Sequence, residues 1–268
     1  MAKGSLVVVG TGIQLAAHLT LEARAFIEQS EKVCFLVNEP VMARWLQELN
    51  PSAESLGYLY AEGKLRLRTY REIITRILIT VRQGVQVCAV FYGHPGVFVT
   101  PAHAVIHLAR QEGFRAIMLP GVSAEDCLFA DLGLDPAHHG CQSYEATEFL
   151  LRRRAADVTT PLILWQVGVV GELTLPPRGG RPRGLSILCE VLQEAYGPEH
   201  PVILYEASRY AGFPPRVERF PLAQLANTPL TPVSTLYVPP RTVLPWDKEM
   251  MVRLGITEAD LEWSKGGE

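Results

Sequence analysis

The chain has 268 residues, of which 48% are hydrophobic and 20% charged, a composition typical of a soluble globular protein with one large or two medium α/β domains. Its net charge of −3 gives no electrostatic basis for binding nucleic acid or an anionic membrane surface. No apolar run reaches the roughly 20 residues of a membrane helix, and residues 1–4 lead into a short strand, so a cytoplasmic protein is predicted. The five scattered cysteines form no C-x-x-C pair, and we expect reduced packing residues and no metal site.

The N-terminal segment predicts a β-α unit. Residues 5–9 form a continuous apolar run that ends in Gly10-Thr11-Gly12, and residues 19–29 show helical periodicity. Because this G-x-G lacks a third glycine in the dinucleotide register, we interpret it as a tight turn rather than a Rossmann cofactor site. A second strand at residues 33–37 and a short helix at 41–49 are predicted next.

Residues 52–68 break all periodicity, and so long a connection in a compact domain is usually functional. A strongly periodic helix is predicted after it, at residues 69–83. Arg66 and Tyr70 are four positions apart at the helix entry. If that turn is helical, both side chains lie on one face and can address the same substrate group.

The most informative stretch is residues 91–98, where an apolar run stops at Gly93-His94-Pro95-Gly96. The two glycines remove Cβ atoms that would keep a ligand off the main chain, and the proline fixes φ. A strand that ends in a rigid ligand loop is one interpretation, and a plain strand-to-helix turn is the other.

Two further strand ends carry polar groups. After a helix at residues 101–112 and a strand at 115–119, Ser123 is placed as the N-cap of a helix, which is compatible with a ligand role as well as a purely structural one. An apolar strand from Pro161 ends in Gln166 and Gly168. Ligands bind at such strand ends in α/β sheets.

The remaining elements are less regular. We expect a division into two α/β lobes, residues 1–122 and 123–240, followed by an extension at 241–268. The elements predicted in the second lobe are a helix at 142–151, a mobile loop at 176–184, a helix at 185–196, a strand at 201–206 and antiparallel strands near 216–219 and 234–238.

Together, Val9-Gly10-Thr11-Gly12, Tyr92-Gly93-His94-Pro95-Gly96, the segment from Pro120 to Asp126 and Trp165-Gln166-Val167-Gly168 resemble the tetrapyrrole methylase superfamily of class III S-adenosylmethionine-dependent methyltransferases. The match is closest to the borosin-type peptide backbone α-N-methyltransferases. The resemblance implies a two-lobed fold with the cofactor, and its product S-adenosylhomocysteine, in the cleft between the lobes. The cofactor contacts that it implies are Tyr92, Gly93, His94, Pro95, Gly96, Val97, Phe98, Ser123, Ala124 and Gln166. We interpret His94 as a hydrogen-bonding brace rather than a base.

The resemblance also implies a catalytic set of Tyr60, Arg66, Tyr70 and Tyr92. A backbone amide nitrogen is a weak nucleophile because its lone pair is delocalised into the carbonyl. Methylation requires loss of the N–H proton and a cation near the carbonyl oxygen. Arg66 supplies that cation, Tyr70 takes or relays the proton, Tyr92 aligns the reacting groups and Tyr60 positions the peptide.

Three functions stay open at this point. The first is backbone α-N-methylation of a precursor peptide, for which the resemblance implies a homodimer in a 2:2 complex with the peptide. We expect this precursor to be a separate molecule, because residues 257–268 are acidic and short and show no Val-, Ile- or Gly-rich run. The second is a precorrin or tetrapyrrole C-methyltransferase, for which Arg152 to Arg154, Arg178, Arg181 and Arg183 could bind substrate carboxylates. The third is a non-catalytic homologue that binds the cofactor or a peptide, which the intact catalytic set argues against.

Overall fold

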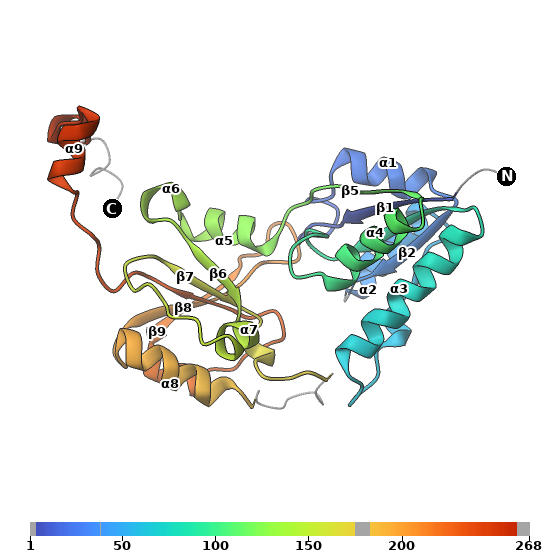
Figure 1. Cartoon of the computed structure of the whole chain (residues 1–268). Helices are drawn as coiled ribbons and strands as arrows, with labels where there is room; N and C mark the ends of the chain where they lie inside the picture. Colours follow the sequence, from blue (N-terminus) through green and yellow to red (C-terminus); the bar gives the residue numbers. More distant parts are fainter. Residues whose placement is uncertain (1–3, 38, 175–182, 262–268) are drawn as a thin grey trace.

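The computed structural model describes residues 4–37, 39–174 and 183–261, which form two lobes, each built on a five-stranded sheet (Figure 1). The N-terminal lobe has the strand order β3-β2-β4-β1-β5, and all neighbours in this sheet are parallel. Parallel neighbours place their carboxyl ends at one edge. The strands are β1 (Ser5–Gly10), β2 (Lys32–Leu36), β3 (Glu54–Ser55), β4 (Gln86–Phe91) and β5 (Arg115–Met118).

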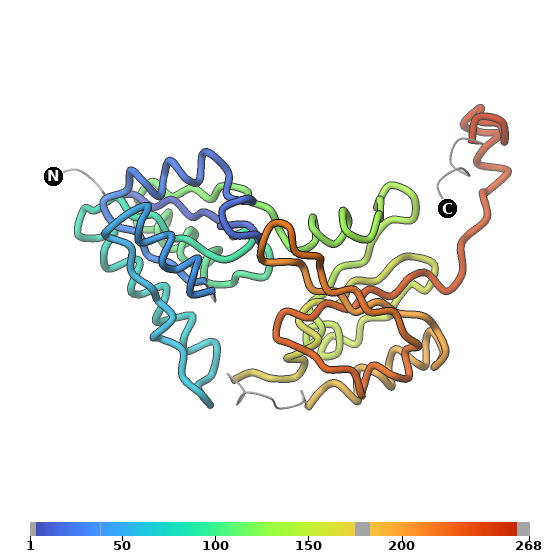
Figure 2. The backbone as a smooth tube through the Cα atoms, turned by 180° about the vertical axis from the view of Figure 1, so that it is seen from behind, coloured from blue at the N-terminus to red at the C-terminus, as the bar shows by residue number. Residues whose placement is uncertain are grey.

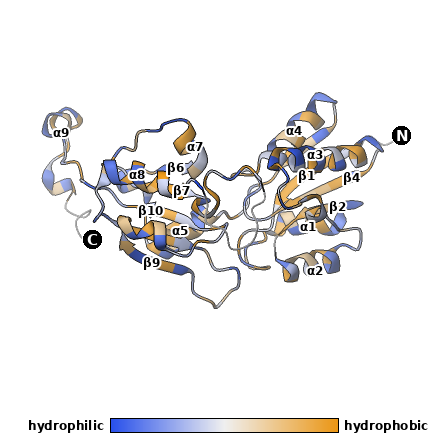
Figure 3. Ribbon diagram, turned by 90° about the horizontal axis from the view of Figure 1, so that it is seen from below, coloured by the Kyte–Doolittle hydropathy of each residue, from blue (hydrophilic) through white to orange (hydrophobic). Residues whose placement is uncertain are grey.

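Helices cover both faces of this sheet, so its inner strands β2, β4 and β1 are buried on both sides and consist largely of apolar residues. On one face, α1 (Leu21–Gln29) and α2 (Pro40–Leu49) bury Ile27 and Leu46 against Val7, Val9 and Phe35. On the other face, α3 (Arg66–Arg82) and α4 (Thr100–Gln111) pack on the alternate side chains of the same strands, as the view from below shows (Figure 3).

The C-terminal lobe has the strand order β6-β7-β10-β8-β9, in which β6 and β7 are parallel and the other neighbours antiparallel. One face is covered by α7 (Ala146–Leu151), α8 (Leu185–Tyr196) and the 3-10 turn η3 (Leu222–Asn227), and the other by α5 (Ala124–Leu132). A short helix, α6 (Pro136–His139), follows α5. The strands are β6 (Gln142–Glu145), β7 (Leu162–Trp165), β8 (Pro201–Glu206), β9 (Arg216–Pro221) and β10 (Thr235–Val238).

Two predicted elements differ from the structure. The helix predicted at residues 142–151 is wrong in its first part, because Gln142–Glu145 pairs with β7 as an edge strand and only Ala146–Leu151 is helical. The helix predicted at 69–83 begins three residues earlier, at Arg66, after the 3-10 turn η1 (Gly57–Leu59). The strands predicted near 216–219 and 234–238 correspond to β9 and β10. Both pair with β8 in the antiparallel direction, as predicted. The loop predicted at 176–184 lies largely outside the described residues.

Among the described residues, the lobes touch at several places. The Leu15 N–H donates to the Arg209 carbonyl at 2.9 Å, where the loop after β8 reaches the N-terminal lobe (Figure 2). Leu65 and Thr174 form an antiparallel bridge, next to which the Arg66 N–H donates to the Leu173 carbonyl at 2.9 Å. A further contact is the ring pair of Phe98 and Trp165, described below.

After β10 the chain leaves the second lobe as an extended arm that ends in α9 (Lys248–Leu254) (Figures 1 and 2). We call residues 239–256 the arm. Its large apolar side chains are unusually exposed for a folded chain. They are Val243, Leu244, Trp246, Met250, Val252, Leu254 and Ile256.

All five cysteines are free thiols, and Cys34, Cys88 and Cys189 are buried, as predicted for packing residues. Within residues 4–37, 39–174 and 183–261, no helix is long and apolar enough to cross a membrane.

Candidate functional site

Three glycine-bearing loops meet at the carboxyl ends of β1, β4 and β5. Gly12 and Gly93 pair through two main-chain hydrogen bonds, of 3.2 Å from the Gly12 N–H and 3.0 Å from the Gly93 N–H. A Cβ atom on Gly10 would lie 2.0 Å from the Gly93 carbonyl oxygen, and one on Gly121 would lie 3.4 Å from it. The main chains therefore approach so closely that a side chain does not fit at Gly10.

The loop from Gly93 to Phe98 is braced by two histidines. His94 Nδ1 accepts a 2.9 Å hydrogen bond from the Gly96 N–H, and His103 Nε2–H donates to the Gly96 carbonyl at 2.8 Å. The Val97 N–H closes the turn onto the His94 carbonyl at 3.2 Å. His94 is thus a brace, as the sequence predicts, while His103 was not anticipated.

Two non-glycine residues of the predicted cofactor set have left-handed backbones. They are Phe98, with φ of 55°, and Gln166, with φ of 60°. The Phe98 ring lies 5.7 Å from the Trp165 ring, centroid to centroid, so the loop after β4 meets the end of β7 across the two lobes. Left-handed backbones at non-glycine residues cost free energy, and they gather at functional sites.

Ser123 and Ala124 begin α5 at the third strand end. Ser123 Oγ accepts from the Asp126 N–H at 3.2 Å, and the Asp126 carboxylate accepts from the Ser123 N–H at 2.7 Å, which makes a capping box. Ser123 is 5% exposed, and Ala124 packs beside the core of the second lobe. The N-cap prediction is confirmed.

Tyr60, Arg66 and Tyr70 come together at the start of α3. Tyr60 follows η1, Arg66 is the first residue of α3, and Tyr70 stands one turn later on the same helix. Burial raises the pKa of the Tyr60 phenol to about 12, the Tyr70 phenol acts in the same direction, and the Arg66 guanidinium opposes the rise. Since these groups affect one another electrostatically, the structure gathers three of the four predicted catalytic residues.

Tyr92 has a different set of neighbours. Burial raises the pKa of its phenol to about 12, with Arg209 lowering it and Cys127 and Glu39 raising it. Arg209 Nη1 lies 3.3 Å from the Glu39 carboxylate and belongs to the loop after β8. Sequence reasoning missed Arg209 and Glu39, because 170 residues separate them and neither lies in a motif.

The basic residues proposed for a carboxylate-rich substrate are partly engaged elsewhere. Arg152 pairs with Glu148 at 2.6 Å, and Arg154 lies over the Tyr144 ring, 5.4 Å from its centroid. Arg183 is exposed, and its N–H donates to Glu172 at 3.1 Å. Arg178 and Arg181 lie outside the described residues.

The raised pKa of Tyr60 predicts a pH dependence of stability. The pKa of Tyr60 is 10.0 without the protein environment and about 12 in the folded chain. Between these two pH values, the Tyr60 phenol loses its proton when the chain unfolds. The stabilisation from burying Tyr60 is therefore complete below pH 10 and is lost as the pH rises to 12. We expect Tyr60→Phe to flatten the fall in unfolding free energy over this range, measured by urea denaturation at each pH. Tyr58→Phe, which changes an exposed ring in the same segment, is the control, and an equal slope in both variants would contradict the assignment.

Sequence comparison places this chain among methylases. The family model for Tetrapyrrole (Corrin/Porphyrin) Methylases matches residues 5–226. The chain is 43% identical over 242 residues to the methyltransferase/ribosomally synthesized cyclic peptide dendrothelin A precursor of Dendrothele bispora, covering 89% of this chain and 58% of that protein. It is 40% identical over 260 residues to the corresponding omphalotin A precursor of Omphalotus olearius, covering 96% and 62%. The chain thus spans about three fifths of the length of these relatives.

Solved structures agree on the fold. Uroporphyrin-III-C-methyltransferase from Thermus thermophilus superposes with a TM-score of 0.63 at 22% identity, over 92% of this chain and 99% of that chain. A structure of that enzyme complexed with S-adenosylhomocysteine gives a TM-score of 0.60 at 19% identity, over 92% and 96%. The methyltransferase CobJ gives 0.62 at 17% identity, over 91% and 98%. The two-lobed α/β fold predicted from the sequence is confirmed.

Proposed function

Because this chain belongs to the tetrapyrrole (corrin/porphyrin) methylase family, we propose that it is an S-adenosylmethionine-dependent methyltransferase that methylates backbone amide nitrogens of a peptide. The observation that best supports a peptide substrate is the grouping of Tyr60, Arg66 and Tyr70 at the start of α3. The relatives that are about 40% identical carry cyclic peptide precursors, which supports the same substrate class.

The glycine-bearing strand ends fit the cofactor. Gly10, Gly96 and Gly121 let the loops pack closely at the edge where β1, β4 and β5 end, and Phe98 with Trp165 adds an apolar surface there. We assign binding to Tyr92, Gly93, His94, Pro95, Gly96, Val97, Phe98, Ser123, Ala124 and Gln166. Bound there, S-adenosylmethionine supplies an electrophilic methyl group.

The residues around Arg66 make the amide reactive. The Arg66 guanidinium stabilises negative charge on the amide oxygen as the nitrogen loses its proton. Tyr70, on the same helix face, takes or relays that proton. Tyr60 and Tyr92, whose pKa values are each about 12, keep their protons near neutral pH and therefore donate hydrogen bonds that orient the peptide.

We further propose that the precursor peptide is a separate molecule and that two copies of the enzyme bind two peptides. The exposed apolar side chains of the arm support a dimer, because apolar surface of this kind is usually covered by a partner.

Mass spectrometry tests this function. The purified protein is incubated with S-adenosylmethionine and either the peptide encoded beside its gene or uroporphyrinogen III. We expect additions of one methyl each on the peptide, which fragmentation places on backbone nitrogens. Methylation of uroporphyrinogen alone would overturn the peptide substrate. Methylation of the protein's own chain, with none on the added peptide, would overturn only the separate precursor.

A further inference from the structure

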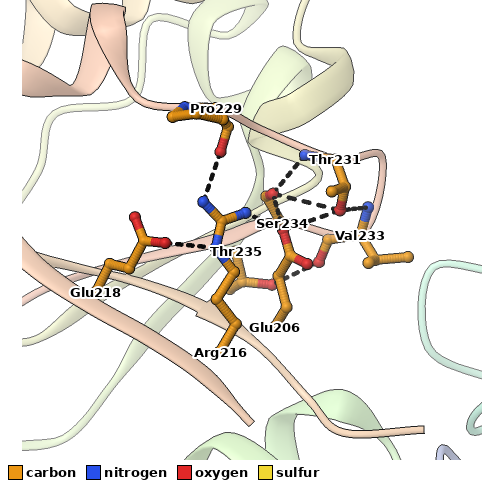
Figure 4. A network of polar contacts seen from close by, with 8 residues as sticks. All are labelled: Glu206, Arg216, Glu218, Pro229, Thr231, Val233, Ser234 and Thr235. Atoms are coloured by element: carbon orange, nitrogen blue, oxygen red, sulfur yellow. Dashed lines mark hydrogen bonds and ion pairs between the residues drawn. The ribbon is translucent and has the colours of Figure 1, made fainter. Parts of the chain in front are cut away.

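Glu206, at the carboxyl end of β8, is the centre of a polar network that the sequence does not reveal (Figure 4). Its Oε1 accepts hydrogen bonds from Arg216 Nη1 at 3.0 Å, from Thr231 Oγ1 at 2.9 Å and from Ser234 Oγ at 2.5 Å. The Glu206 side chain is only 13% exposed. A carboxylate withdrawn from water needs such partners, and here two of the three are neutral hydroxyls of one turn.

Arg216 is held on its other sides as well. Its Nε donates to Glu218 at 2.8 Å and its Nη2 to the Pro229 carbonyl at 2.8 Å. Arg216 therefore links Glu206 to Pro229, just before residues 231–234. The same guanidinium binds a second carboxylate, Glu218, and this carboxylate does not contact the turn.

The turn at residues 231–234 is closed by its own hydrogen bonds. The Ser234 N–H donates to the Thr231 carbonyl at 3.0 Å, and Ser234 Oγ accepts from the Thr231 N–H at 2.8 Å. Ser234 is fully buried. The turn is thus fixed in shape by these bonds and fixed in place by Glu206.

The 231–234 turn supports the backbone around Gln166. The Val167 N–H donates to the Ser234 carbonyl at 3.1 Å, and a Cβ atom on Gly168 would lie only 1.8 Å from the Thr231 carbonyl oxygen. The backbone around Gln166 therefore rests directly on the 231–234 turn. Its left-handed conformation, which is costly for a residue with a side chain, persists only where the surroundings enforce it.

We propose that Glu206 is a positioning residue for the cofactor site. By holding the 231–234 turn, its carboxylate keeps the main chain of Gln166 in the left-handed conformation from which the Gln166 side chain contacts S-adenosylmethionine. The inference rests on the proposed function, because it requires that Gln166 contacts the cofactor.

The experiment measures S-adenosylhomocysteine binding by calorimetry in purified variants, with thermal melting as the check on folding. We expect Glu206→Ala to weaken binding by about tenfold and Glu206→Gln, which keeps the Oε1 acceptor, to restore it to within about threefold of the wild type. Glu218→Ala removes the other carboxylate from the same arginine and should change binding by less than about twofold. If Glu206→Ala does not fold, Thr231→Val removes one donor to Glu206 and should weaken binding in the same direction.

A double-variant cycle separates positioning from general stability. If Glu206 acts through Gln166, then adding Glu206→Ala to Gln166→Ala produces no further loss of affinity. Additive losses, or an effect of Glu218→Ala as large as that of Glu206→Ala, would overturn this inference while the methyltransferase proposal stands. A wild-type protein that binds neither S-adenosylmethionine nor its product would overturn both.

Discussion

Replacing Arg66 with alanine is expected to lower the rate of methyl transfer by about 10²- to 10³-fold, because one donor to a developing oxyanion contributes that much. The dissociation constant for S-adenosylmethionine should stay within about threefold, since Arg66 lies outside the loops to which we assign cofactor binding. Arg66 lies at the start of α3, whereas the glycine-bearing loops follow β1, β4 and β5. Its N–H bond to Leu173 survives the substitution, so the helix start is retained. Single-turnover methylation of the peptide and calorimetry measure the two quantities.

Arg68→Ala is the matched control for this change. Arg68 is in the same helical turn, but its side chain is 77% exposed and lies 3.6 Å from Glu72. It should therefore leave the methylation rate within about twofold, as exposed ion pairs contribute little. A full rate in Arg66→Ala, or equal losses in the two variants, would refute the charge-stabilising role of Arg66.

The second large effect is expected at Gly10. In Gly10→Ala the new methyl group would lie 2.0 Å from the Gly93 carbonyl oxygen and 2.8 Å from Pro95 Cδ. The loops that follow β1 and β4 must therefore move apart. Because the nearest obstacle is backbone, we expect the unfolding free energy to fall by about 3 kcal/mol. Cofactor binding should weaken as well, since the Gly12–Gly93 pairing holds the loop in place. Urea denaturation and calorimetry measure the two effects.

Gly121→Ala provides the comparison within the same group of loops. A Cβ atom there would lie 3.4 Å from the Gly93 carbonyl oxygen, which is ordinary contact, and its stability should stay within about 1 kcal/mol of the wild type. If Gly10→Ala is as stable as Gly121→Ala, then the close approach of the two main chains does not constrain the loops.

Strands and helix caps whose sequence signal lies in adjacent residues could be predicted from the sequence. The apolar runs of β1 and β4 and the Ser123 cap were placed to within one or two residues, because continuous burial and N-cap chemistry leave signals in adjacent positions. The residues Gln142–Glu145 gave no such signal. They form an edge strand of mostly polar side chains, and their strand state depends on pairing with β7, some 20 positions later.

The surroundings of the site could not be predicted for a related reason. Tyr60, Arg66 and Tyr70 are near in sequence, so helical spacing brings two of them together without knowledge of the fold. The neighbours of Tyr92 come from the N-cap of α2, from α5 and from the loop after β8, and the support of Gln166 comes from the turn before β10. Such pairings are set by how the two sheets face each other, which single-sequence periodicity does not encode.

The position of β1 in its sheet bears on how the protein is made. Val7, Val8 and Val9 leave the ribosome before β4 and β5, the two strands with which β1 pairs, so the partners of Ser5 at Gln86 and Arg115 arrive 81 and 110 residues later. During that interval this buried strand has no partner strand to pair with, and non-local pairings of this kind form slowly. Gly12 and Gly93 meet only once β1 and β4 are side by side. The cofactor site is thus a late product of synthesis, and S-adenosylmethionine can stabilise the finished lobe without guiding its early folding.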